Sequence, residues 1–504
     1  MISKNVMGSL SFDLEKVSIF VNGGIPLGTM FFGFLGYKFN FNFHFVTVTF
    51  FLLTLINFYY LYIQRGHTLL ANFGLVAQLR YLIESVGPEF RQYLFLSDTE
   101  EKPFDRIDRS EVYRKAKGVD AYSSFGSQLL FNRSEIKLRH SMYPIAKTEL
   151  IPFSLVFGEE RGIKNTYELK HPIIISAMSF GALGERAVRS LARGAKKAGI
   201  PMNTGEGGFP KYHLLEDCDL IFQIGTAKFG VRNEDGTLNE EKLYEISAKK
   251  QVKIIEIKLS QGAKPGKGGV LPKEKITLEI SQLRGIPLGQ DIISPAFHSE
   301  CRTAELTIQF IKRIQDISQL PVGIKLCLGN VQEFRELVHE MKKQNIFPDY
   351  ISIDGAEGGT GAAPKSFMDD LGIPIFKALP LVQEILKSAG VRDKLKLLAA
   401  GKLIDPGRQF IAYSMGADTI YTARGFMLAL GCIQALQCNQ NTCPVGITTH
   451  NNNLQNGLAI EQKSVRVENY VKSLAHEHED LLASLGKRSI NELSRKNLYQ
   501  EGSY

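Results

Sequence analysis

A repeated alternation of buried strands and amphipathic helices from His171 onward is the feature that most constrains this 504-residue chain. Short apolar runs end in Gly, Ser, Asp or Lys: HPIIISAM, KIIEIKLS, PVGIKLC, DYISIDG, KLLAAG and DTIYTARG. Helical stretches separate them, among them residues 185–198, 303–317 and 331–344. Strands that are apolar on both faces and alternate with helices form parallel sheets. Six or more such strands over about 250 residues favour an α/β fold of the (β/α)8 TIM-barrel type over an open doubly wound sheet.

Polar residues gather at the carboxyl ends of the predicted strands, where barrel enzymes place their active sites. Lys258 ends one strand, and Lys325 lies inside an otherwise apolar one. A lysine there is costly unless an anionic group meets it or its ammonium group reaches the rim of the barrel. Small residues at 176–181 allow the backbone to approach a flat ligand, and Glu206 offers a carboxylate within the Gly-rich segment 203–208.

Four further loops are rich in glycine or basic residues. The segment 261–269 is basic and suits an anionic ligand, but it lacks the terminal K-[ST] of a Walker A loop. A second Gly-rich segment covers residues 354–362. Residues 400–402 and 423–425 follow the last two strands, where barrels commonly hold a phosphate group. No G-x-G-x-x-G opens a helix, so the sequence does not support a nicotinamide-binding Rossmann domain.

Three of the six cysteines lie close together, in the pattern Cys432-x5-Cys438-x4-Cys443-Pro444. Thiolates that converge on one point suit a soft metal centre. The C-x2-C spacing of zinc sites is absent, so the pattern favours an iron–sulfur cluster.

The number of cysteines leaves alternatives open for this loop. Four cysteine ligands are usual, so the missing fourth indicates a three-iron cluster or a ligand from Cys218, Cys301 or Cys327. The other interpretations are three unrelated thiols, or a Cys3His zinc site that uses His450. A barrel with a phosphate site, an in-strand lysine and an iron–sulfur loop describes a flavin enzyme, because a flavin handles both one-electron and two-electron steps.

Two long apolar segments precede the barrel. Residues 17–37 carry no charge, and residues 39–64 carry none apart from His44. Each is long enough to cross a hydrocarbon core of about 30 Å, so we expect two transmembrane helices. A buried hairpin in the core of a soluble protein is the alternative.

The residues that flank these segments predict their orientation. Tyr59, Tyr60 and Tyr62 end the second segment as an interfacial aromatic belt. Lys38 is the basic residue of the short connection, and Arg65 with further arginines follows the second segment. By the positive-inside tendency both ends, and with them the catalytic domain, face the cytoplasm.

Composition limits the partners and the compartment. The net charge of +8 is modest for this length, and no Lys/Arg run interleaves with aromatic residues, so we expect no nucleic-acid binding. Six cysteines at irregular spacing argue against a disulfide framework, which agrees with a reducing cytoplasmic location.

The motifs resemble those of the FMN-binding synthase domain of glutamate synthase over residues 150 to 455. The matching segments, in the same order, are SAMSFGALG, NTGEGG, IEIKLSQGAKPGKGG, RGIPLGQDIISP, GIKL, GGTGAAP and CIQALQCNQNTCPVG. The resemblance implies FMN and a [3Fe-4S] cluster held by Cys432, Cys438 and Cys443. It also implies reductive amination of 2-oxoglutarate through 2-iminoglutarate, with electrons from a donor protein of ferredoxin-like or reductase type. With its apolar head, the whole chain resembles the short branch of that family.

The resemblance also implies roles for individual residues. The residues that bind FMN are Ser176, Ala177, Met178, Ser179, Lys325, Gly358, Gly359, Gly401, Arg424 and Gly425. Of these, Lys325 approaches the pyrimidine edge of the flavin, and Gly401, Arg424 and Gly425 hold the phosphate. The residues that face the oxo acid are Glu206, Lys258, Lys264 and Arg284.

Four departures from the family pattern bear on the substrate. The full-length enzymes begin with a glutaminase whose nucleophile is an N-terminal cysteine, whereas no cysteine precedes Cys218 here. Glutamine hydrolysis therefore does not carry over, and we expect ammonia to come free or from a partner. Val270 replaces a glutamine, Lys267 replaces an acid and Ala356 replaces a histidine. The flavin chemistry thus transfers better than the identity of the substrate.

The predicted organisation has four parts: a membrane-anchor hairpin at 1–64, a helical connector at 65–150, the barrel with its iron–sulfur loop at 151–455 and a helical tail at 456–504. The leading hypothesis is a glutamate synthase-like oxidoreductase anchored in the membrane. The alternatives are a flavin oxidoreductase for another oxo acid or imine, and a redox-inactive interaction module, which predicts a colourless protein.

Overall fold

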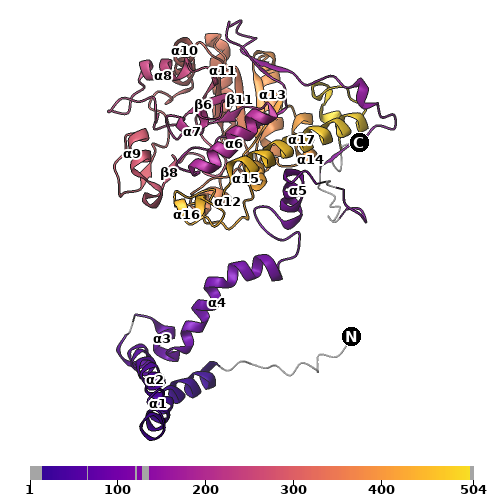
Figure 1. Ribbon diagram of the computed structural model, residues 1–504. Coiled ribbons are helices and arrows are strands. Elements are labelled where there is room, and N and C mark those ends of the chain that lie inside the picture. The colour runs from indigo at the N-terminus through magenta and orange to yellow at the C-terminus, as the bar shows by residue number, and fades with distance from the viewer. Residues whose placement is uncertain (1–13, 65, 120–121, 128–135, 500–504) are drawn as a thin grey trace. The chain divides into compact units, whose positions relative to one another are not determined.

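The computed structural model describes residues 14–64, 66–119, 122–127 and 136–499 (Figure 1). The chain divides into two compact units, Met1–Asp105 and Arg106–Tyr504. The predicted four-part organisation also covers residues 1–13 and 500–504, which lie outside the described residues.

The second unit is built on a closed barrel of eight parallel strands, counted over its described residues. Each strand is a short apolar run whose side chains are buried on both faces, as the sequence indicated. The last strand pairs with the first, with Thr422 opposite Ile175, and this pairing closes the barrel. The predicted (β/α)8 fold is therefore confirmed. In chain order the strands are β4 (Ile173–Ile175), β5 (Met202–Asn203), β6 (Leu220–Ile224), β7 (Val252–Lys258), β10 (Val322–Leu326), β11 (Tyr350–Asp354), β12 (Lys396–Ala400) and β13 (Thr419–Thr422).

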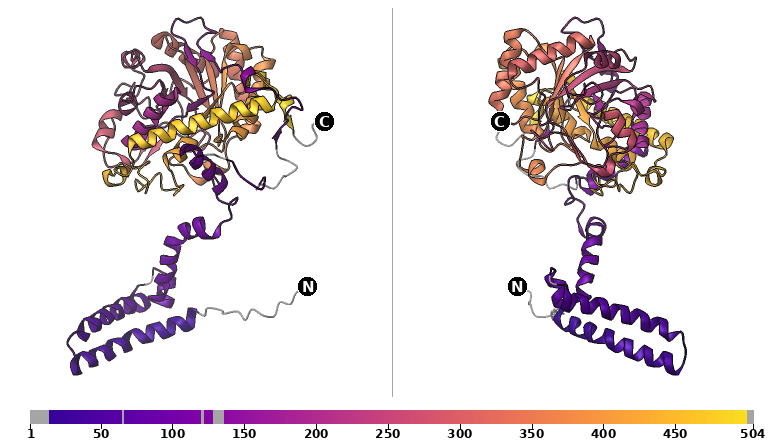
Figure 2. Two further views of the ribbon diagram at one scale, coloured as in Figure 1. Left: turned by 45° about the vertical axis from the view of Figure 1, so that its right-hand side comes forward. Right: turned by 90° about the vertical axis from the view of Figure 1, so that its left-hand side faces the viewer.

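Helices follow the strands and form the outer layer (Figure 2). Several begin where a side chain caps the first backbone N–H groups, as Thr303, Asn330 and Asp405 do. The helices Glu185–Ala198 and Val331–Gln344 have the bounds expected from the sequence. The helices are α6 (Glu185–Ala198), α7 (Lys211–Leu214), α8 (Glu240–Ser247), α10 (Ala304–Ser318), α11 (Val331–Gln344), α13 (Ile375–Ser388), α14 (Pro406–Ser414) and α15 (Arg424–Leu430).

Additional elements extend the barrel at its loops and termini. The segment between β7 and α10 holds β8 (Val270–Leu271), a 3-10 turn η4 (Lys273–Lys275), α9 (Leu278–Arg284) and β9 (Ile292–Ile293). The others are α5 (Arg106–Ala116), β1 (Lys137–Leu138), η3 (Lys147–Glu149), β2 (Leu155–Phe157), β3 (Tyr167–Leu169), α12 (Lys365–Asp369), η5 (Arg392–Lys394), α16 (Asn452–Gln455), α17 (Ile460–Ser484), η6 (Ile490–Glu492), η7 (Arg495–Asn497) and β14 (Leu498–Tyr499).

The long helix α17 packs directly on α6. A side chain at Gly194 in α6 would place its Cβ 2.4 Å from the Cβ of Val467 in α17, so the missing side chain permits this close approach. The C-terminal helix is thus part of the outer layer of the barrel.

A polar network occupies the interior of the barrel around the carboxylate of Glu256, which is fully buried. Asn203 and Gln223 donate to its Oε1 at 2.8 and 2.7 Å. The hydroxyls of Tyr350 and Tyr421 donate to its Oε2 at 2.9 and 3.0 Å. Side chains from five strands therefore meet at this buried carboxylate, and both of its oxygens accept hydrogen bonds.

The hairpin of β2 and β3 packs apolar side chains against this interior. Leu155, Phe157 and Leu169 join the same hydrophobic cluster as Tyr350 and Tyr421. The rings of Phe157 and Tyr350 lie edge to face with centroids 5.4 Å apart, an arrangement that aromatic pairs prefer.

The first unit is a helical hairpin followed by shorter helices. Its elements are α1 (Leu14–Lys38), α2 (Phe43–Phe58), a π-helical turn η1 (Tyr59–Ile63), α3 (Thr68–Phe73), α4 (Val76–Phe90) and a second π-helical turn η2 (Arg91–Phe95). Two stretches, Val17–Lys38 and Phe43–Ile63, are long and apolar enough to cross a membrane. The hydroxyls of Thr29 and Thr54 meet at 3.2 Å between them.

Gly323 in β10 generates a prediction about stability. A Cβ at this position would lie 2.1 Å from Cζ of the buried Tyr350 ring. Gly323→Ala should therefore destabilise the barrel by about 1–3 kcal/mol, because overpacking forces the ring away from Glu256. A thermal melt followed by circular dichroism measures the effect. Gly329→Ala is the matched control, because nothing lies within 4 Å of its Cβ position. Equal melting temperatures for both variants would contradict the tight packing at Gly323.

Candidate active site at the carboxyl ends of the barrel strands

Charged side chains from neighbouring strands meet at the carboxyl end of the barrel. Lys325 Nζ in β10 lies 3.4 Å from Asp354 Oδ2 at the end of β11. The same oxygen accepts the backbone N–H of Gly262 at 3.2 Å, which ties in the loop after β7. Lys325 therefore has an anionic partner in Asp354, which offsets the cost of burying its charge in an apolar strand. The sequence marked Asp354 only as the start of a Gly-rich loop and missed it as the lysine's partner.

Four residues predicted to face the substrate form one charged cluster around Glu206. Lys258 Nζ lies 2.5 Å from Glu206 Oε1 and 2.6 Å from the side-chain oxygen of Gln261. Lys264 donates from Nζ to the carbonyl of Ala362 at 3.1 Å, from the second Gly-rich loop. Arg284 belongs to the group through the electrostatic coupling of its charge to Glu206.

The titration of these groups shows how closely their charges interact. Burial alone would raise the pKa of Glu206, but the charges of Lys258, Lys264 and Arg284 outweigh it and hold that pKa below its ordinary value. Burial lowers the pKa of Lys264 to about 8, and the charge of Lys258 adds to the effect. Burial also lowers the pKa of Arg284 to about 10. The pocket thus holds a carboxylate ringed by cations that are costly to keep charged without an anion.

Arg284 is the clearest sign that a ligand belongs here. Its guanidinium is buried, donates from one terminal nitrogen to the carbonyl of Phe180 at 2.9 Å and lies 5.3 Å from the ring centroid of Phe229. Its Nε has no hydrogen-bond partner among the described residues. A buried cation with an unused donor favours an anionic ligand.

The predicted flavin loop after β4 packs against the loop after β5. A side chain at Gly205 would meet the backbone of Ser179 at 2.7 Å, so the two loops approach through their backbones. Ser176 donates its N–H to Thr422 O at 3.1 Å, and the carbonyl of Met178 contacts His213 Nε2 at 3.2 Å. The predicted residues 176–179 are therefore held on a fixed segment, with Ala177 and Ser179 half-buried. Sequence reasoning did not identify His213 as the support of this loop.

The predicted phosphate residues follow two neighbouring strands, Gly401 after β12 and Arg424 with Gly425 after β13, and the Gly-rich loop after β11 lies beside Arg424. Arg424 donates to the carbonyl of Glu357 at 2.5 Å, and a side chain at Gly359 would place its Cβ 2.9 Å from the Nε of Arg424. Gly401 has φ of +131°, which other residues rarely adopt. Gly358 lies in the same turn as Gly359, and its N–H donates to the carbonyl of Gly355.

Gly425 is required for a different reason. A side chain there would lie 2.6 Å from the hydroxyl of Tyr470 in α17, so the absence of a Cβ serves helix packing. Tyr470 in turn donates to the carbonyl of Ile404 at 2.5 Å.

The three cysteines of the C-terminal motif follow α15 in one loop. Burial raises the pKa of Cys432 to about 11, and the nearby thiols of Cys438 and Cys443 add to it. The backbone N–H of Gln434 points to Cys432 Sγ at 3.4 Å. Within the described residues, no three side chains of ligand type lie close enough to hold a single metal ion.

Lys275 joins the cysteine loop to the predicted flavin loop, a role that no motif in the sequence indicated. Its buried Nζ donates to the carbonyl of Ala182 at 2.5 Å and to that of Cys438 at 3.2 Å. Burial lowers the pKa of Lys275 to about 8, against the opposing effect of Cys438 and Cys443. A cation therefore stands between the two loops.

His450 and Cys218 do not lie in the cysteine loop. His450 Nε2 lies 3.0 Å from the carbonyl of Gly181, its ring packs edge-on against Phe180, and burial lowers its pKa to about 4. Cys218 precedes β6 at the amino end of the barrel, opposite the candidate site.

The residues that depart from the family pattern also have defined positions. Val270 in β8 follows Gly269, whose Cβ position is 2.8 Å from Glu206 Oε1, so the β8–β9 hairpin covers the carboxylate. The ammonium group of Lys267 lies 5.4 Å from the ring centroid of Phe367. Val270 is therefore at the edge of the pocket, and Lys267 contacts an aromatic ring.

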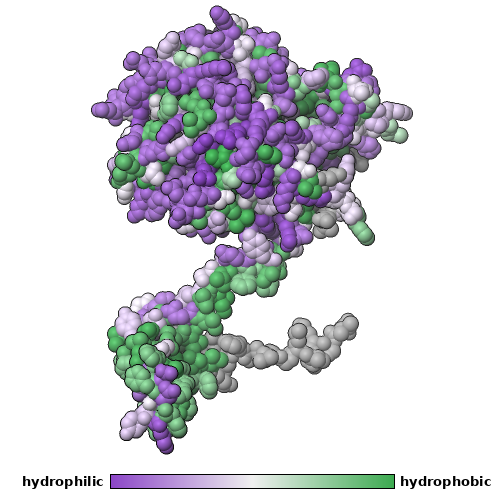
Figure 3. Space-filling view, viewed as in Figure 1, coloured by the Kyte–Doolittle hydropathy of each residue, from purple (hydrophilic) through white to green (hydrophobic). Residues whose placement is uncertain are grey.

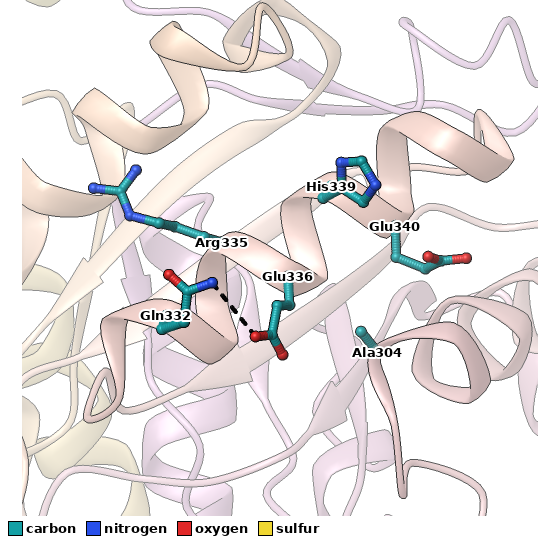
Figure 4. A pocket seen from close by; sticks show the side chains of 6 residues that line it. All are labelled: Ala304, Gln332, Arg335, Glu336, His339 and Glu340. Atoms are coloured by element: carbon teal, nitrogen blue, oxygen red, sulfur yellow. Dashed lines mark hydrogen bonds between the residues drawn. The ribbon is translucent and has the colours of Figure 1, made fainter.

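A separate shallow hollow lies on the outer face of α11 (Figure 4). Two of its side chains are hydrogen-bonded to each other, since Gln332 donates to Glu336 at 3.4 Å. Most of them are exposed to solvent on the outside of the barrel, so the hollow is no part of the candidate site. Its lining residues are Ala304, Gln332, Arg335, Glu336, His339 and Glu340.

Comparisons with known proteins identify the family. Residues 123–488 match the model described as the conserved region in glutamate synthase. The glutamate synthase large subunit-like protein YerD of Bacillus subtilis is 37% identical over 474 residues, which cover 86% of this chain and 90% of that protein. The archaeal glutamate synthase [NADPH] of Methanocaldococcus jannaschii is 37% identical over 326 residues, 65% of this chain and 61% of its own length. Among solved structures, an (S)-mandelate dehydrogenase chimera has a TM-score of 0.48 at 13% identity, over 79% of this chain and 92% of that one. The chain belongs to the glutamate synthase family and is a glutamate synthase-like oxidoreductase.

Proposed function

We propose that this protein reductively aminates 2-oxoglutarate to glutamate, with ammonia that is free or delivered by a partner and with electrons from a donor protein. The observation that carries the proposal is the pocket around Glu206, in which Lys258, Lys264 and Arg284 converge at the carboxyl ends of the strands. Family membership supports the reaction type, because the named relatives are glutamate synthases.

Charge matching supports a dicarboxylate as the substrate. Lys258 is paired with Glu206 at 2.5 Å, which leaves Lys264 and Arg284 as two cations for two carboxylate groups. Charge-assisted hydrogen bonds from an ammonium and a guanidinium to carboxylates are about twice as strong as neutral ones. Burial strengthens these interactions further, since it excludes water.

The proposed reaction balances in two steps. Ammonia condenses with the oxo group to give an imine and water, and the imine carbon then takes up a hydride while the nitrogen takes up a proton. Glu206 and Lys258, joined by one short hydrogen bond, are the pair placed to hold and move the protons of the condensation.

The residues of the two adjacent loops fit FMN. Gly205 and Gly207 let the backbone of the segment 176–179 pack closely on the loop after β5, and the missing side chain of Gly359 lets Arg424 lie against the loop after β11. When bound, FMN supplies hydride transfer and accepts electrons singly. Lys325 would hold positive charge beside the flavin ring, while Arg424 and Gly401 would hold its phosphate.

The cysteine loop fits an iron–sulfur cluster better than a zinc ion. The thiols of Cys432, Cys438 and Cys443 interact electrostatically, and their spacing lacks the C-x2-C pattern of zinc sites. Thiolates are the usual ligands of iron–sulfur clusters. We infer a [3Fe-4S] cluster held by these three cysteines.

We further propose that α1 and α2 cross a membrane, with the catalytic unit on the cytoplasmic side. Few side chains of the two stretches Val17–Lys38 and Phe43–Ile63 are buried, whereas a core helix of a soluble protein would be mostly buried. In Figure 3 most of the visible surface of this hairpin is hydrophobic. Exposed apolar area of this extent is costly in water and favourable in lipid.

Lys325 provides a test of the flavin assignment. Lys325→Met should lower the reduction potential of the bound flavin, because the cation that stabilises the anionic reduced form is lost. Spectroelectrochemical titration of the purified protein measures it, and the released cofactor should be FMN. Lys115→Met is the control, since Lys115 is equally buried and pairs with Glu477 in the outer helices. An unchanged potential in Lys325→Met would remove this lysine from the flavin site.

The cysteines provide a test of the cluster. Serine at Cys432, Cys438 or Cys443 should each remove iron and the broad visible absorption, because a three-cysteine site has no spare ligand. Cys301→Ser should keep both, as a cysteine outside the motif. Iron analysis and visible spectra decide it, and full iron in all three motif variants would disprove the assignment.

The substrate is tested by reoxidation of the reduced protein. Addition of 2-oxoglutarate and ammonia should reoxidise it and yield glutamate. The oxo acid's affinity should be constant below pH 8 and fall above it, because the unliganded protein loses the Lys264 proton near a pKa of about 8 and the dianion requires it. Lys264→Met should weaken binding at pH 7 by about tenfold or more and remove the pH inflection, a loss equivalent to about 1.5–3 kcal/mol for a bond to a charge.

Two variants serve as controls for the substrate. Lys267→Met should keep the inflection, since Lys267 contacts Phe367. Val270→Gln restores the family's amide at the edge of the pocket and should tighten 2-oxoglutarate. Failure of 2-oxoglutarate with ammonia to reoxidise both the parent protein and Val270→Gln would favour the second candidate, a flavin oxidoreductase for another oxo acid or imine, which the replacement by Val270 supports.

A further inference from the structure

We propose that α4, with the turn η2 that follows it, lies flat in the membrane interface and forms a third lipid contact beside the hairpin. The proposal rests on the membrane location of α1 and α2 and adds a surface that their assignment does not require. It names the partner of an apolar stripe that the other helices of the first unit leave exposed.

The stripe is a regular face of the helix. Leu79, Leu82, Ile83, Val86 and Phe90 recur at spacings of three and four residues, which places them on one side of an α-helix. All five side chains are exposed, from 39% at Val86 to 61% at Leu82. In the turn η2, Tyr93 and Leu94 continue as exposed apolar residues. The hydrophobic atoms along this segment are visible in Figure 3.

The face of α4 beside the stripe carries charges. Arg80 and Glu84, one turn apart, form an ion pair at 2.9 Å with both side chains largely exposed. A helix with one apolar face and one charged face binds at the surface of a bilayer, with the apolar face among the acyl chains and the charges among the headgroups. With 15 residues, α4 is about 22 Å long and too short to span the hydrocarbon core.

Hydrogen bonds fix the start of α4 at the end of the hairpin. The backbone N–H of Leu75 donates to Asn57 Oδ1 at 2.8 Å, and Gln78 donates to the hydroxyl of Tyr60 at 3.2 Å. Tyr60 belongs to the tyrosine-rich end of the second apolar stretch, the residue type that sits at the membrane–water boundary. The first turn of α4 is therefore held at the depth of the interface if the hairpin spans the membrane.

The direction of α4 agrees with this placement. Within the first unit α4 leaves the end of the hairpin at a steep angle and does not run alongside it, as Figures 1 and 2 both show. A helix that starts at the interface and runs across the spans lies in the plane of the membrane. A lipid surface also covers the hairpin and the stripe together, whereas a second copy of the chain bound only to the stripe would leave the hairpin exposed.

The absence of tryptophan from the chain makes a direct test possible. Three single-tryptophan variants of the full-length protein are reconstituted into liposomes with and without brominated acyl chains: Ile83→Trp on the stripe, Glu84→Trp on the polar face and Phe51→Trp in α2. Ile83→Trp should emit at shorter wavelength than Glu84→Trp, lose most of its intensity in brominated lipid and resist aqueous iodide. Glu84→Trp, the adjacent control, should respond to iodide and not to brominated lipid.

Each pattern of quenching decides the proposal. Quenching of Phe51→Trp by brominated lipid without quenching of Ile83→Trp would overturn the surface helix and leave the hairpin in the membrane. Ile83→Trp that is blue-shifted but insensitive to both quenchers would show that protein, such as a second copy of the chain, covers the stripe, and would also overturn it. If neither Phe51→Trp nor Ile83→Trp responds to brominated lipid, the membrane location itself is wrong and the surface helix falls with it.

Discussion

The geometry of the candidate site depends on one buried carboxylate. Glu256 accepts four hydrogen bonds from side chains on four other strands of the barrel. A buried carboxylate is tolerated only where donors satisfy it, and loss of any donor would leave the charge short of partners. The network therefore links β7 across the barrel to β11 and β13, strands with which it forms no backbone pairing.

Strand periodicity carries this constraint to the site. Glu256 and Lys258 are two residues apart on β7 and so point to the same face, as do Gly323 and Lys325 on β10. In the pairing of these strands Gly323 is opposite Glu256 and Lys325 is opposite Lys258. A shift of one residue would turn both lysines away from the interior. The layer that holds Glu256 thus sets the register of the layer that holds the site's lysines.

The sequence predicted those parts of the molecule that are written locally along the chain. Strand ends, helix bounds such as those of α6 and the cysteine loop each show in a short segment. Glu256, Lys275 and His213 were missed, because their roles come from partners far away in the chain. Lys275 contacts Cys438 from 163 positions away, and no pattern near Lys275 signals it. Asp354 stood in view as a loop residue, but only the closed barrel shows that it meets Lys325.

The cations beside Glu206 are buried at a cost in free energy. Arg284 and Lys264 are buried, and burial lowers the pKa of both, which means that their charged forms are less stable here than in water. Glu206 is already paired with Lys258 and compensates them only in part. An anion bound beside them would supply the missing charge and would thereby stabilise the fold. Lys264 lies in the loop after β7 and Arg284 ends α9, so of the cations beside Glu206 only Lys258 sits on the strand that carries Glu256. The Glu206–Lys258 ion pair therefore ties the loop after β5 to that strand, and through it the buried network of the barrel determines where the carboxylate of the candidate site lies.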